Sequence, residues 1–521
     1  MDKKAKFSRI ATEINSVEKI LKAIESGKRQ AAEPKATESR EGYVAPRTQL
    51  ERFLADKWQE MFGIDRIGVH ENFFELGIDS VKAAVFLNRL QQDLGEAVYI
   101  VALFDSPTIA GLAIYLSAHY PKAVARVCGP ESIEHSQDQK VIHDARQAPS
   151  IEASNVAQFR QSVSSQPRVK RAPGAAETKN PPAIFILAPP RSGTTLLRVM
   201  LGGHPSLFAP PELQLLYFDT LEERRAAFSG RNVYWQEGTI RALMQIKGCD
   251  AEQAGIILEG YEKEGLTTKE FYRLMQGWLA GKILVDKTPF YALDLEVLKR
   301  AEDYFDHALY IHLLRHPQGA IRSFEEARID QVFWYEHPYS VSELAELVWL
   351  ISHQNIIEFF KTVPAARQLQ IKFEDLVKKP QDAMEETCQF LGLSFHPDML
   401  RPYADNKLRM TDGPEGVLRM LGDLKFHSHK NIDASVADRW EKEKSAPILA
   451  NMTWEMAEHL GYESLITPAD DAPTIDDSPT DNAQSPIEPV SRKNKNLNQF
   501  LEELKQLSDD DVRLLLENKR R

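Results

Sequence analysis

The sequence predicts an α/β fold, a P-loop-like parallel sheet flanked by helices over residues 182–462, joined to a small all-α domain over residues 47–120. Four short apolar runs predict the sheet: AIFIL (183–187), KILVD (282–286), LYIHLL (309–314) and LQIKF (369–373). Longer helical patterns separate them, and strands that alternate with helices form a parallel sheet covered on both faces. In the small domain one apolar stripe recurs at helical spacing: Leu50, Phe53, Leu54, Trp58, Met61 and Phe62.

The composition is typical of a globular protein, with 43% apolar and 27% charged residues in 521. A formal net charge of -12 argues against a general nucleic-acid binder, which would be basic. The three cysteines lie far apart, so neither a metal site nor a disulfide framework is expected. The N-terminus lacks the apolar core of a signal peptide, and no apolar run approaches the ~20 residues of a membrane span. We therefore expect a cytoplasmic protein with no membrane segment.

The remaining segments are predicted to be terminal helices and linkers. Residues 1–28 and 496–521 carry amphipathic helical patterns, which makes each a candidate docking element; the alternative is a solvated helix without a partner. Residues 29–46 are polar and contain two prolines. Residues 121–181 are predicted to be a flexible linker, because their composition offers little apolar surface to offset the entropy of ordering. Residues 463–495, which are largely acidic and rich in proline and serine, are predicted to be a second linker.

The small domain contains the stretch NFFELGIDSVKAAVFLNRL, in which Ser80 begins a helical pattern after a glycine turn. From the residues alone, such a serine is most simply an N-cap. The whole segment, from VAPRTQLERFL to FDSPTIAGLAIYL, resembles the four-helix acyl and peptidyl carrier domains of polyketide and nonribosomal peptide assembly lines. The resemblance implies that Ser80 carries 4′-phosphopantetheine, attached by a phosphopantetheinyl transferase. It leaves polyketide and peptide cargo both open.

A phosphate-binding loop is predicted where the first strand of the sheet meets a helix, in ILAPPRSGTTLLRVM. The backbone N–H groups of Ser192 to Thr195 would point outward at a helix N-terminus, and such a site binds anions. Gly193 allows close backbone approach, Arg191 adds a guanidinium suited to phosphate, and Thr194 adds a hydroxyl. The stretch lacks the Gly-Lys-Ser/Thr ending of the common nucleotide loop.

A second phosphate site is predicted in LYIHLLRHPQGAIRSF, where Arg315 follows a strand and Ser323 lies in the next helix. Ligands of such sheets bind outside the carboxyl ends of the strands. Two separate sites suit a nucleotide phosphorylated at both 5′ and 3′. The motifs PRSGTTLL and RHPxxxxxSF resemble the 5′- and 3′-phosphate motifs of sulfotransferases that use PAPS, 3′-phosphoadenylyl sulfate. Further stretches, including LLRVMLGGHPSLFAPPELQLL, resemble the carrier-linked sulfotransferases of olefin-forming polyketide synthases.

This resemblance implies roles for individual residues. Those that would hold the 5′-phosphosulfate are Arg191, Ser192, Gly193, Thr194 and Thr195. Arg315 and Ser323 would hold the 3′-phosphate, and Lys430 would belong to a late basic loop over the nucleotide. Lys287, in the stretch DKTP, would lie beside the transferring group. Asp286, next to it in the sequence, is a candidate to orient either Lys287 or the acceptor.

The general base is predicted with alternatives. Glu212 is the first candidate, because tyrosylprotein-type sulfotransferases place a catalytic glutamate at the matching position; a salt-bridged structural carboxylate is the alternative. His204 is second, although in the stretch GHP it more simply ends a helix. His312 reads as a core histidine, and His316 and His353 stay open as bases, because a base must reach the acceptor hydroxyl.

The sequence therefore predicts a natural-product assembly-line enzyme. It would carry a hydroxyacyl or peptidyl thioester on phosphopantetheine and transfer a sulfuryl group from PAPS to the hydroxyl of that cargo. Neighbouring polyketide or peptide synthase subunits, met through the terminal helices, are the expected partners; nucleic acid and membrane are not. A phosphoryl-transfer enzyme and a non-catalytic carrier scaffold are the two alternatives.

Overall fold

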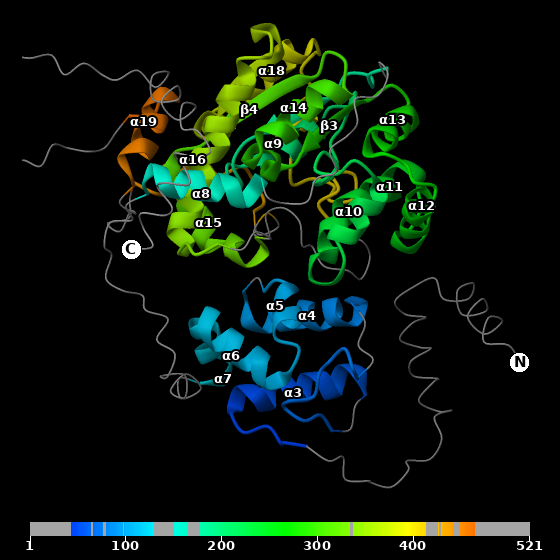
Figure 1. The fold of residues 1–521 in the computed structure, drawn as a ribbon, viewed down its shortest axis with the longest axis vertical. Helices are drawn as coiled ribbons and strands as arrows, with labels where there is room; N and C mark the ends of the chain where they lie inside the picture. The colour runs from blue at the N-terminus through cyan, green and yellow to red at the C-terminus, as the bar shows by residue number, and fades with distance from the viewer. Residues whose placement is uncertain are drawn as a thin grey trace, which may run out of the picture. The chain divides into compact units, whose positions relative to one another are not determined.

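The structure is a computed structural model that describes residues 43–63, 66–76, 80–96, 98–129, 151–164, 178–333, 337–412, 426, 429–441 and 449–463. The expected terminal helices, 1–28 and 496–521, lie outside these residues. The chain divides into two compact units (Figure 1): a small one that holds the described residues 43–129 with the segment 230–237, and a large one that holds almost all the others. No helix in the described ranges is both long and apolar enough to cross a membrane.

The small unit is helical, as the sequence predicts. Within 43–129 the described residues form five α-helices: α3 (Gln49–Phe62), α4 (Ser80–Leu94), α5 (Val101–Asp105), α6 (Ile109–His119) and α7 (Pro121–Cys128). The last of them lies beyond the expected domain end at residue 120. It packs on α3, α4 and α6 and buries Ala123 and Val124, so the helical domain is one helix larger than the sequence predicts.

Helix α3 starts at a capping box and carries the predicted stripe into the core. The hydroxyl of Thr48 accepts a hydrogen bond from the Glu51 amide at 3.0 Å, and the Glu51 carboxylate accepts one from the Thr48 amide at 3.2 Å. Both bonds satisfy N–H groups that a helix start leaves unpaired. Trp58, fully buried, stacks on Phe73 and Phe86 with ring centroids 4.1 and 4.2 Å apart.

The large unit is built on a five-stranded parallel sheet with the strand order β2-β3-β1-β4-β5. The strands are β1 (Ile184–Leu187), β2 (Leu207–Phe208), β3 (Ile283–Lys287), β4 (Leu309–Leu314) and β5 (Gln368–Lys372). Four coincide with the predicted apolar runs to within one residue at each end. Strand β2 is missing from the prediction, because two residues give no periodic pattern.

Alternate residues of the strands enter two hydrophobic clusters, one on each face of the sheet. Phe185 and Leu187 of β1 belong to one cluster, and Ile184 and Ile186 belong to the other. Successive side chains of a strand point to opposite faces, so a sheet covered on both faces needs apolar residues at every position. This explains why the fully buried β1 reads as a continuous apolar run in the sequence.

Helices flank the sheet on both sides. They are α8 (Ala153–Ser164), α9 (Thr194–Leu201), α10 (Leu221–Ala227), α11 (Glu237–Lys247), α12 (Ala251–Lys263), α13 (Thr268–Trp278), α14 (Leu295–Tyr304), α15 (Pro317–Glu326), α16 (Val341–Phe360), α17 (Phe373–Lys378), α18 (Pro380–Leu391) and α19 (Asn451–His459). Short 3₁₀ helices of the large unit are η4 (Pro289–Leu293), η5 (Ile329–Val332), η6 (Ala365–Arg367), η7 (Pro397–Leu400) and η9 (Ala434–Val436). The 3₁₀ helix η3 (Gly230–Gln236) belongs to the small unit.

The segment 121–181 is not the uniform flexible linker that its composition predicts. Helix α7 takes its first residues into the small unit, and α8 forms part of the large unit. Val156, Phe159 and Val163 of α8 are buried, at the three- and four-residue spacing of one helix face. The linker prediction is wrong at both helices, because it weighed average composition and overlooked these apolar residues on one face.

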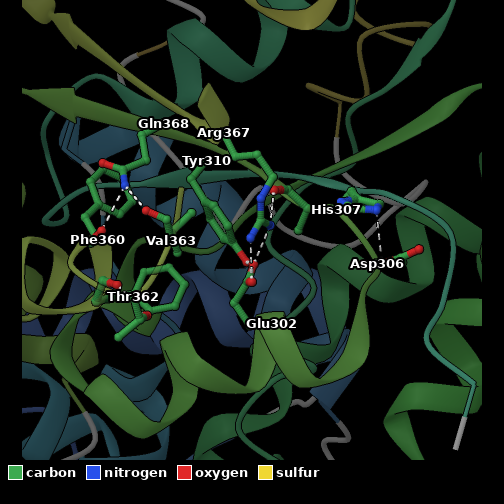
Figure 2. A network of polar contacts seen from close by, with 11 residues as sticks. Glu302, Asp306, His307, Tyr310, Phe360, Thr362, Val363, Arg367 and Gln368 are labelled. Carbon is green, nitrogen blue, oxygen red and sulfur yellow. Dashed lines mark hydrogen bonds and ion pairs between the residues drawn. The ribbon is translucent and has the colours of Figure 1, made fainter. Parts of the chain in front are cut away.

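A polar network holds the edge strand β5 to the rest of the sheet (Figure 2). The Arg367 guanidinium, just before β5, donates two hydrogen bonds of 2.8 Å to the Glu302 carboxylate on α14, and the Tyr310 hydroxyl on β4 donates one of 2.5 Å. Burial acts to raise the pKa of Glu302, but these bonds prevail and lower it. The network fixes β5, after which Phe373 enters the candidate site.

Candidate active site

The sheet brings the separate sequence motifs to one edge. Ile186 of β1 pairs with Lys287, the last residue of β3. Strand β4 ends at Leu314, so Arg315 is the first residue beyond the same edge, and Arg191 follows the end of β1. Because the strands are parallel, all these residues lie at the carboxyl edge, where ligands of such sheets bind.

The two predicted phosphate motifs touch each other. Arg191 Nε donates a hydrogen bond to Ser323 Oγ at 3.2 Å, and Arg315 Nη1 donates one to the Arg191 carbonyl oxygen at 2.6 Å. Both motifs line a single cavity, the loop cavity. The predicted residues in its wall are Arg191, Gly193, Thr194, Thr195, Arg315 and Ser323. These predicted residues contribute two guanidinium groups and three hydroxyls to the wall, a donor set that suits phosphate oxygens.

The loop conformation depends on glycine at position 193. Gly193 has a φ of +90° and precedes α9 as its N-cap, in the left-handed region where side chains are strained. A Cβ there would lie 2.2 Å from the Phe373 ring. Arg191 also adopts a positive φ, of +69°, which is uncommon for a residue with a side chain. Backbone strain of this kind concentrates at functional sites.

The loop also contains a buried hydroxyl with no partner among the described residues. Ser192 is fully buried, and its Oγ makes no hydrogen bond. A buried polar group left unmatched costs about 1 to 3 kcal/mol. Thr194 is the first residue of α9, so the N–H groups beside Ser192 belong to a helix N-terminus. Hydroxyl, amides and helix dipole together fit an anion.

A buried ion pair joins Glu212 to Lys287. Lys287 Nζ lies 2.7 Å from Glu212 Oε1, and the two side chains keep only 2% and 9% of their surfaces exposed, lysine and glutamate respectively. Burial lowers the pKa of Lys287, while Glu212 opposes the shift. The carboxylate is the more accessible partner, and Gln214 Nε2 approaches its other oxygen at 3.4 Å.

Arg198 adds a third charge near this pair, one that the sequence motifs do not mark. It is fully inside the protein, where its guanidinium donates to the carbonyl oxygens of Ala209 at 2.9 Å and Arg409 at 3.0 Å. Burial lowers its pKa to about 10, and the charge of Glu212 opposes this shift. Arg198 thus places a further positive charge near the ion pair, on the helix that directly follows the phosphate loop.

Asp286 does not pair with Lys287 in the contacts of the described residues. Its carboxylate accepts hydrogen bonds from the Tyr272 hydroxyl at 2.5 Å and the Thr288 hydroxyl at 2.9 Å. Burial raises its pKa to about 6, against the opposing effect of these bonds. Tyr291 approaches the same carboxylate and accepts the Leu215 amide at 2.8 Å, so this network fixes the chain just after Glu212.

The domain that contains these residues is similar to known proteins. The family model described as "Sulfotransferase family" matches residues 182–397 of the chain. The sulfotransferase domain from the curacin biosynthetic pathway is 39% identical, with a TM-score of 0.52, over 55% of this chain and 99% of that one. The chain belongs to the sulfotransferase family. The sulfotransferase domain from the Synechococcus PCC 7002 olefin synthase is similar too, 36% identical with a TM-score of 0.51, over 56% of this chain and 100% of that one.

The small unit precedes the sulfotransferase domain and has relatives of its own. The family model described as "Phosphopantetheine attachment site" matches residues 52–116 of the chain. Tyrocidine synthase 3 of Brevibacillus parabrevis is 47% identical over 76 residues, which are 15% of this chain and 1% of that protein. Surfactin synthase subunit 3 of Bacillus subtilis (strain 168) is 37% identical over 89 residues, 17% of this chain and 7% of that protein. The chain thus joins a carrier domain to a sulfotransferase domain of the assembly-line type.

The sulfotransferase domain does not bring His204 to the ion pair. His204 lies beside Ser206, whose carbonyl oxygen accepts the amide of Ile283, the first residue of β3, whereas Lys287 is the last. Strand β3 has five residues, so its first and last residues, and with them the two edges of the sheet, lie about 13 Å apart. Both ring nitrogens of His204 are occupied, by the Ser394 carbonyl oxygen at 2.9 Å and the Ser206 amide at 3.1 Å. The structure supports its structural role at a helix end.

The other three candidate bases, His312, His316 and His353, are packed in the interior of the sulfotransferase domain. His312 and His353 form a buried pair with ring nitrogens 2.9 Å apart, and burial lowers the pKa of both, that of His312 to about 3. His316 stacks on Trp440 with ring centroids 3.7 Å apart, and burial lowers its pKa to about 4. All three are buried, and a lowered pKa makes each a weak proton acceptor, so Glu212 stays the first candidate for the base.

Two further predicted residues are placed as follows. Lys430 is exposed and is not among the residues that line the loop cavity, whereas its neighbours His429 and Asp433 do line it. Ser80 is the first residue of α4 in the carrier domain, the helix-start position that the motif predicts. The sequence prediction missed Phe373 and Trp440 in the cavity wall, since nothing in the local sequence marks an aromatic residue as part of a site.

Proposed function

We propose that this protein transfers a sulfuryl group from PAPS to a hydroxyl of a chain that its own carrier domain holds on phosphopantetheine. The observation that carries the proposal is the contact between the two phosphate motifs through Arg191 and Ser323, at the sheet edge where Lys287 and Glu212 pair. The similarity to sulfotransferase domains of the curacin pathway and of an olefin synthase supports the same chemistry.

The nucleotide is assigned to the loop cavity. Arg191, Ser192 and the amides at the start of α9 bind the 5′-phosphosulfate, because they combine charge, a buried donor and a helix N-terminus. Arg315 and Ser323 bind the 3′-phosphate. The contact between Arg191 and Ser323 links the two subsites, so a nucleotide that carries both phosphates engages donors that a 5′-nucleotide alone leaves unused.

The transfer step is assigned to the ion pair. Glu212 accepts the proton of the acceptor hydroxyl as the hydroxyl oxygen forms a bond to sulfur and the bond from sulfur to the 5′-phosphate oxygen breaks, which releases PAP, the desulfated nucleotide. Lys287 and Arg191 stabilise the charge that develops on the transferred and leaving groups. As in phosphoryl transfer, position and charge account for most of the catalysis in a loose transition state.

The acceptor is assigned to the carrier domain. Phosphopantetheine on Ser80 supplies the thioester that tethers the hydroxyacyl or peptidyl chain, and a phosphopantetheinyl transferase installs it. We propose a carrier domain that begins at residue 47 and extends past residue 120 to the end of α7, and a sulfotransferase domain over 182–462, with neighbouring synthase subunits as partners. The match to the phosphopantetheine attachment site and the similarity to peptide synthases support these assignments.

Calorimetry with PAP tests the nucleotide assignment. Wild-type protein is expected to bind PAP, and Ser323→Ala is expected to weaken that binding about 10- to 100-fold, because a hydrogen bond to a charged group contributes about 1.5 to 3 kcal/mol. The control is Ser229→Ala, which removes an exposed hydroxyl bonded to a backbone carbonyl and leaves affinity unchanged. Binding of ATP–Mg²⁺ without binding of PAP would favour the phosphoryl-transfer alternative and reject the assignment.

A further inference from the structure

Helix α8 is attached to the sulfotransferase domain by an arginine that joins two buried amides. Arg160 donates to the Asn355 side-chain oxygen at 2.6 Å and to the Gln354 side-chain oxygen at 2.7 Å. Both partners lie on α16 and are only 2% and 3% exposed. Arg160 keeps part of its surface in solvent, yet burial of the guanidinium lowers its pKa to about 10. Figure 1 shows α8, in cyan, among the green helices of this domain.

Two routes connect α8 to η4, the turn that begins just after Lys287 and Thr288. In the polar route, Asn355 accepts from Arg160 and donates from Nδ2 to the Ala292 carbonyl oxygen at 2.9 Å. In the aromatic route, the fully buried Phe159 contacts Phe333, which contacts Phe290 of η4; the ring centroids are 6.0 and 5.8 Å apart. The two routes reach η4 through different residues.

The 3₁₀ turn η4 contacts the chain beside both members of the ion pair, Lys287 and Glu212. It follows the strand end that carries Lys287, so its position fixes the direction of that side chain. Its Tyr291 hydroxyl accepts the amides of Leu215 at 2.8 Å and Leu216 at 3.2 Å, a few residues after Glu212. A displacement of η4 would therefore shift lysine and glutamate relative to each other.

We propose that α8 is a positioning element of the active site: Arg160 and Phe159 hold η4 and, through it, the pair of Glu212 and Lys287 in working geometry. This inference rests on the proposed function for its catalytic consequence. Helix α8 lies outside residues 182–397, where the family matches, and between the carrier and sulfotransferase domains in the sequence. The segment that connects the two domains thus also supports the site that receives the carried chain.

The test compares Arg160→Met with Gln161→Ala in the full-length protein. Gln161 is the exposed neighbour on the same helix, so its replacement is the control. Hydrogen exchange of peptides covering 288–294 is expected to quicken at least about tenfold in Arg160→Met, and to stay unchanged in the control. A lower kcat, by about 10- to 100-fold, with unchanged PAP affinity is expected alongside, because small misplacements of catalytic groups have effects of that size. Arg160→Lys, which keeps the positive charge but has one donor nitrogen in place of the two that bond Asn355 and Gln354, is expected to restore part of kcat.

The outcomes separate this inference from the proposed function. Unchanged exchange at 288–294 in Arg160→Met, or exchange that quickens equally throughout the sulfotransferase domain, would overturn the positioning role. Loss of PAP affinity in proportion to kcat would overturn it too, since that result indicates general damage. If wild-type protein transferred no sulfuryl group at all, the proposed function would fail, while exchange in η4 would still decide whether α8 holds this turn.

Discussion

Replacement of Glu212 by glutamine is expected to lower kcat about 10²- to 10⁴-fold, the range that a general base contributes. Glutamine has the same shape, and its side-chain oxygen can still accept the hydrogen bond from Lys287, which is 2.7 Å long in the wild type. It cannot take the proton of the acceptor hydroxyl. Affinity for PAP is expected to stay at the wild-type value, because the loop cavity is not lined by Glu212. Single-turnover kinetics with loaded protein and PAPS measure the rate.

The control for this variant is Glu222→Gln, which makes the same chemical change on the exposed face of α10. It is expected to leave both kcat and PAP affinity at wild-type values. A Glu212→Gln protein that keeps wild-type kcat would show that the buried carboxylate is only the structural partner of Lys287. The general base would then be another group at the same sheet edge.

Replacement of Gly238 by alanine is expected to lower kcat about 100-fold, although it replaces no charged residue. A Cβ at Gly238 would lie 1.9 Å from the backbone oxygen of Glu212 and 2.7 Å from its carbonyl carbon. Contacts this short force the backbone of Glu212 to move, and a displacement of about 1 Å can cost about 10²-fold in rate. The expected signature is a fall in kcat with unchanged PAP affinity, measured by kinetics and calorimetry on one preparation.

Gly255→Ala is the matched control. Gly255 also lies in a helix of the sulfotransferase domain, α12, but a Cβ there would meet nothing within 4 Å. Alanine in that helix is expected to raise stability by about 0.5 to 1 kcal/mol and to leave kcat unchanged. Wild-type kcat in Gly238→Ala, or an equal fall in both variants, would contradict the role assigned to the position of Glu212.

Much of the fold could be predicted, because strands buried on both faces leave a strong local signal. Every residue of the run around Phe185 is apolar, and the structure shows why: alternate side chains enter separate hydrophobic clusters. The prediction missed strand β2 and helix α8 for different reasons. Two residues form no pattern, and the polar residues of α8 hide an apolar face whose value depends on Phe333 and Tyr339, far along the chain.

The candidate site could be predicted only where its residues form contiguous motifs. Arg191 and Ser323 each stand in a recognisable string, and parallel strands carry both strings to one edge. Arg198 looks like an ordinary charged residue of a helix, and only its burial beside Glu212 marks it. His204 illustrates the reverse error: it lies near the loop in sequence, but α9 carries it to the opposite edge of the sheet.

The central claim is that the sulfuryl acceptor is a chain tethered to Ser80 of the same protein. Its most direct test is intact-mass spectrometry of the full-length protein after loading with a 3-hydroxyacyl phosphopantetheine arm, with and without PAPS. The account predicts a gain of one sulfuryl group on the released arm when PAPS is present, and neither arm nor sulfuryl group on Ser80→Ala. A loaded arm that gains no sulfuryl group from PAPS, across hydroxyacyl chains of several lengths, would contradict the account.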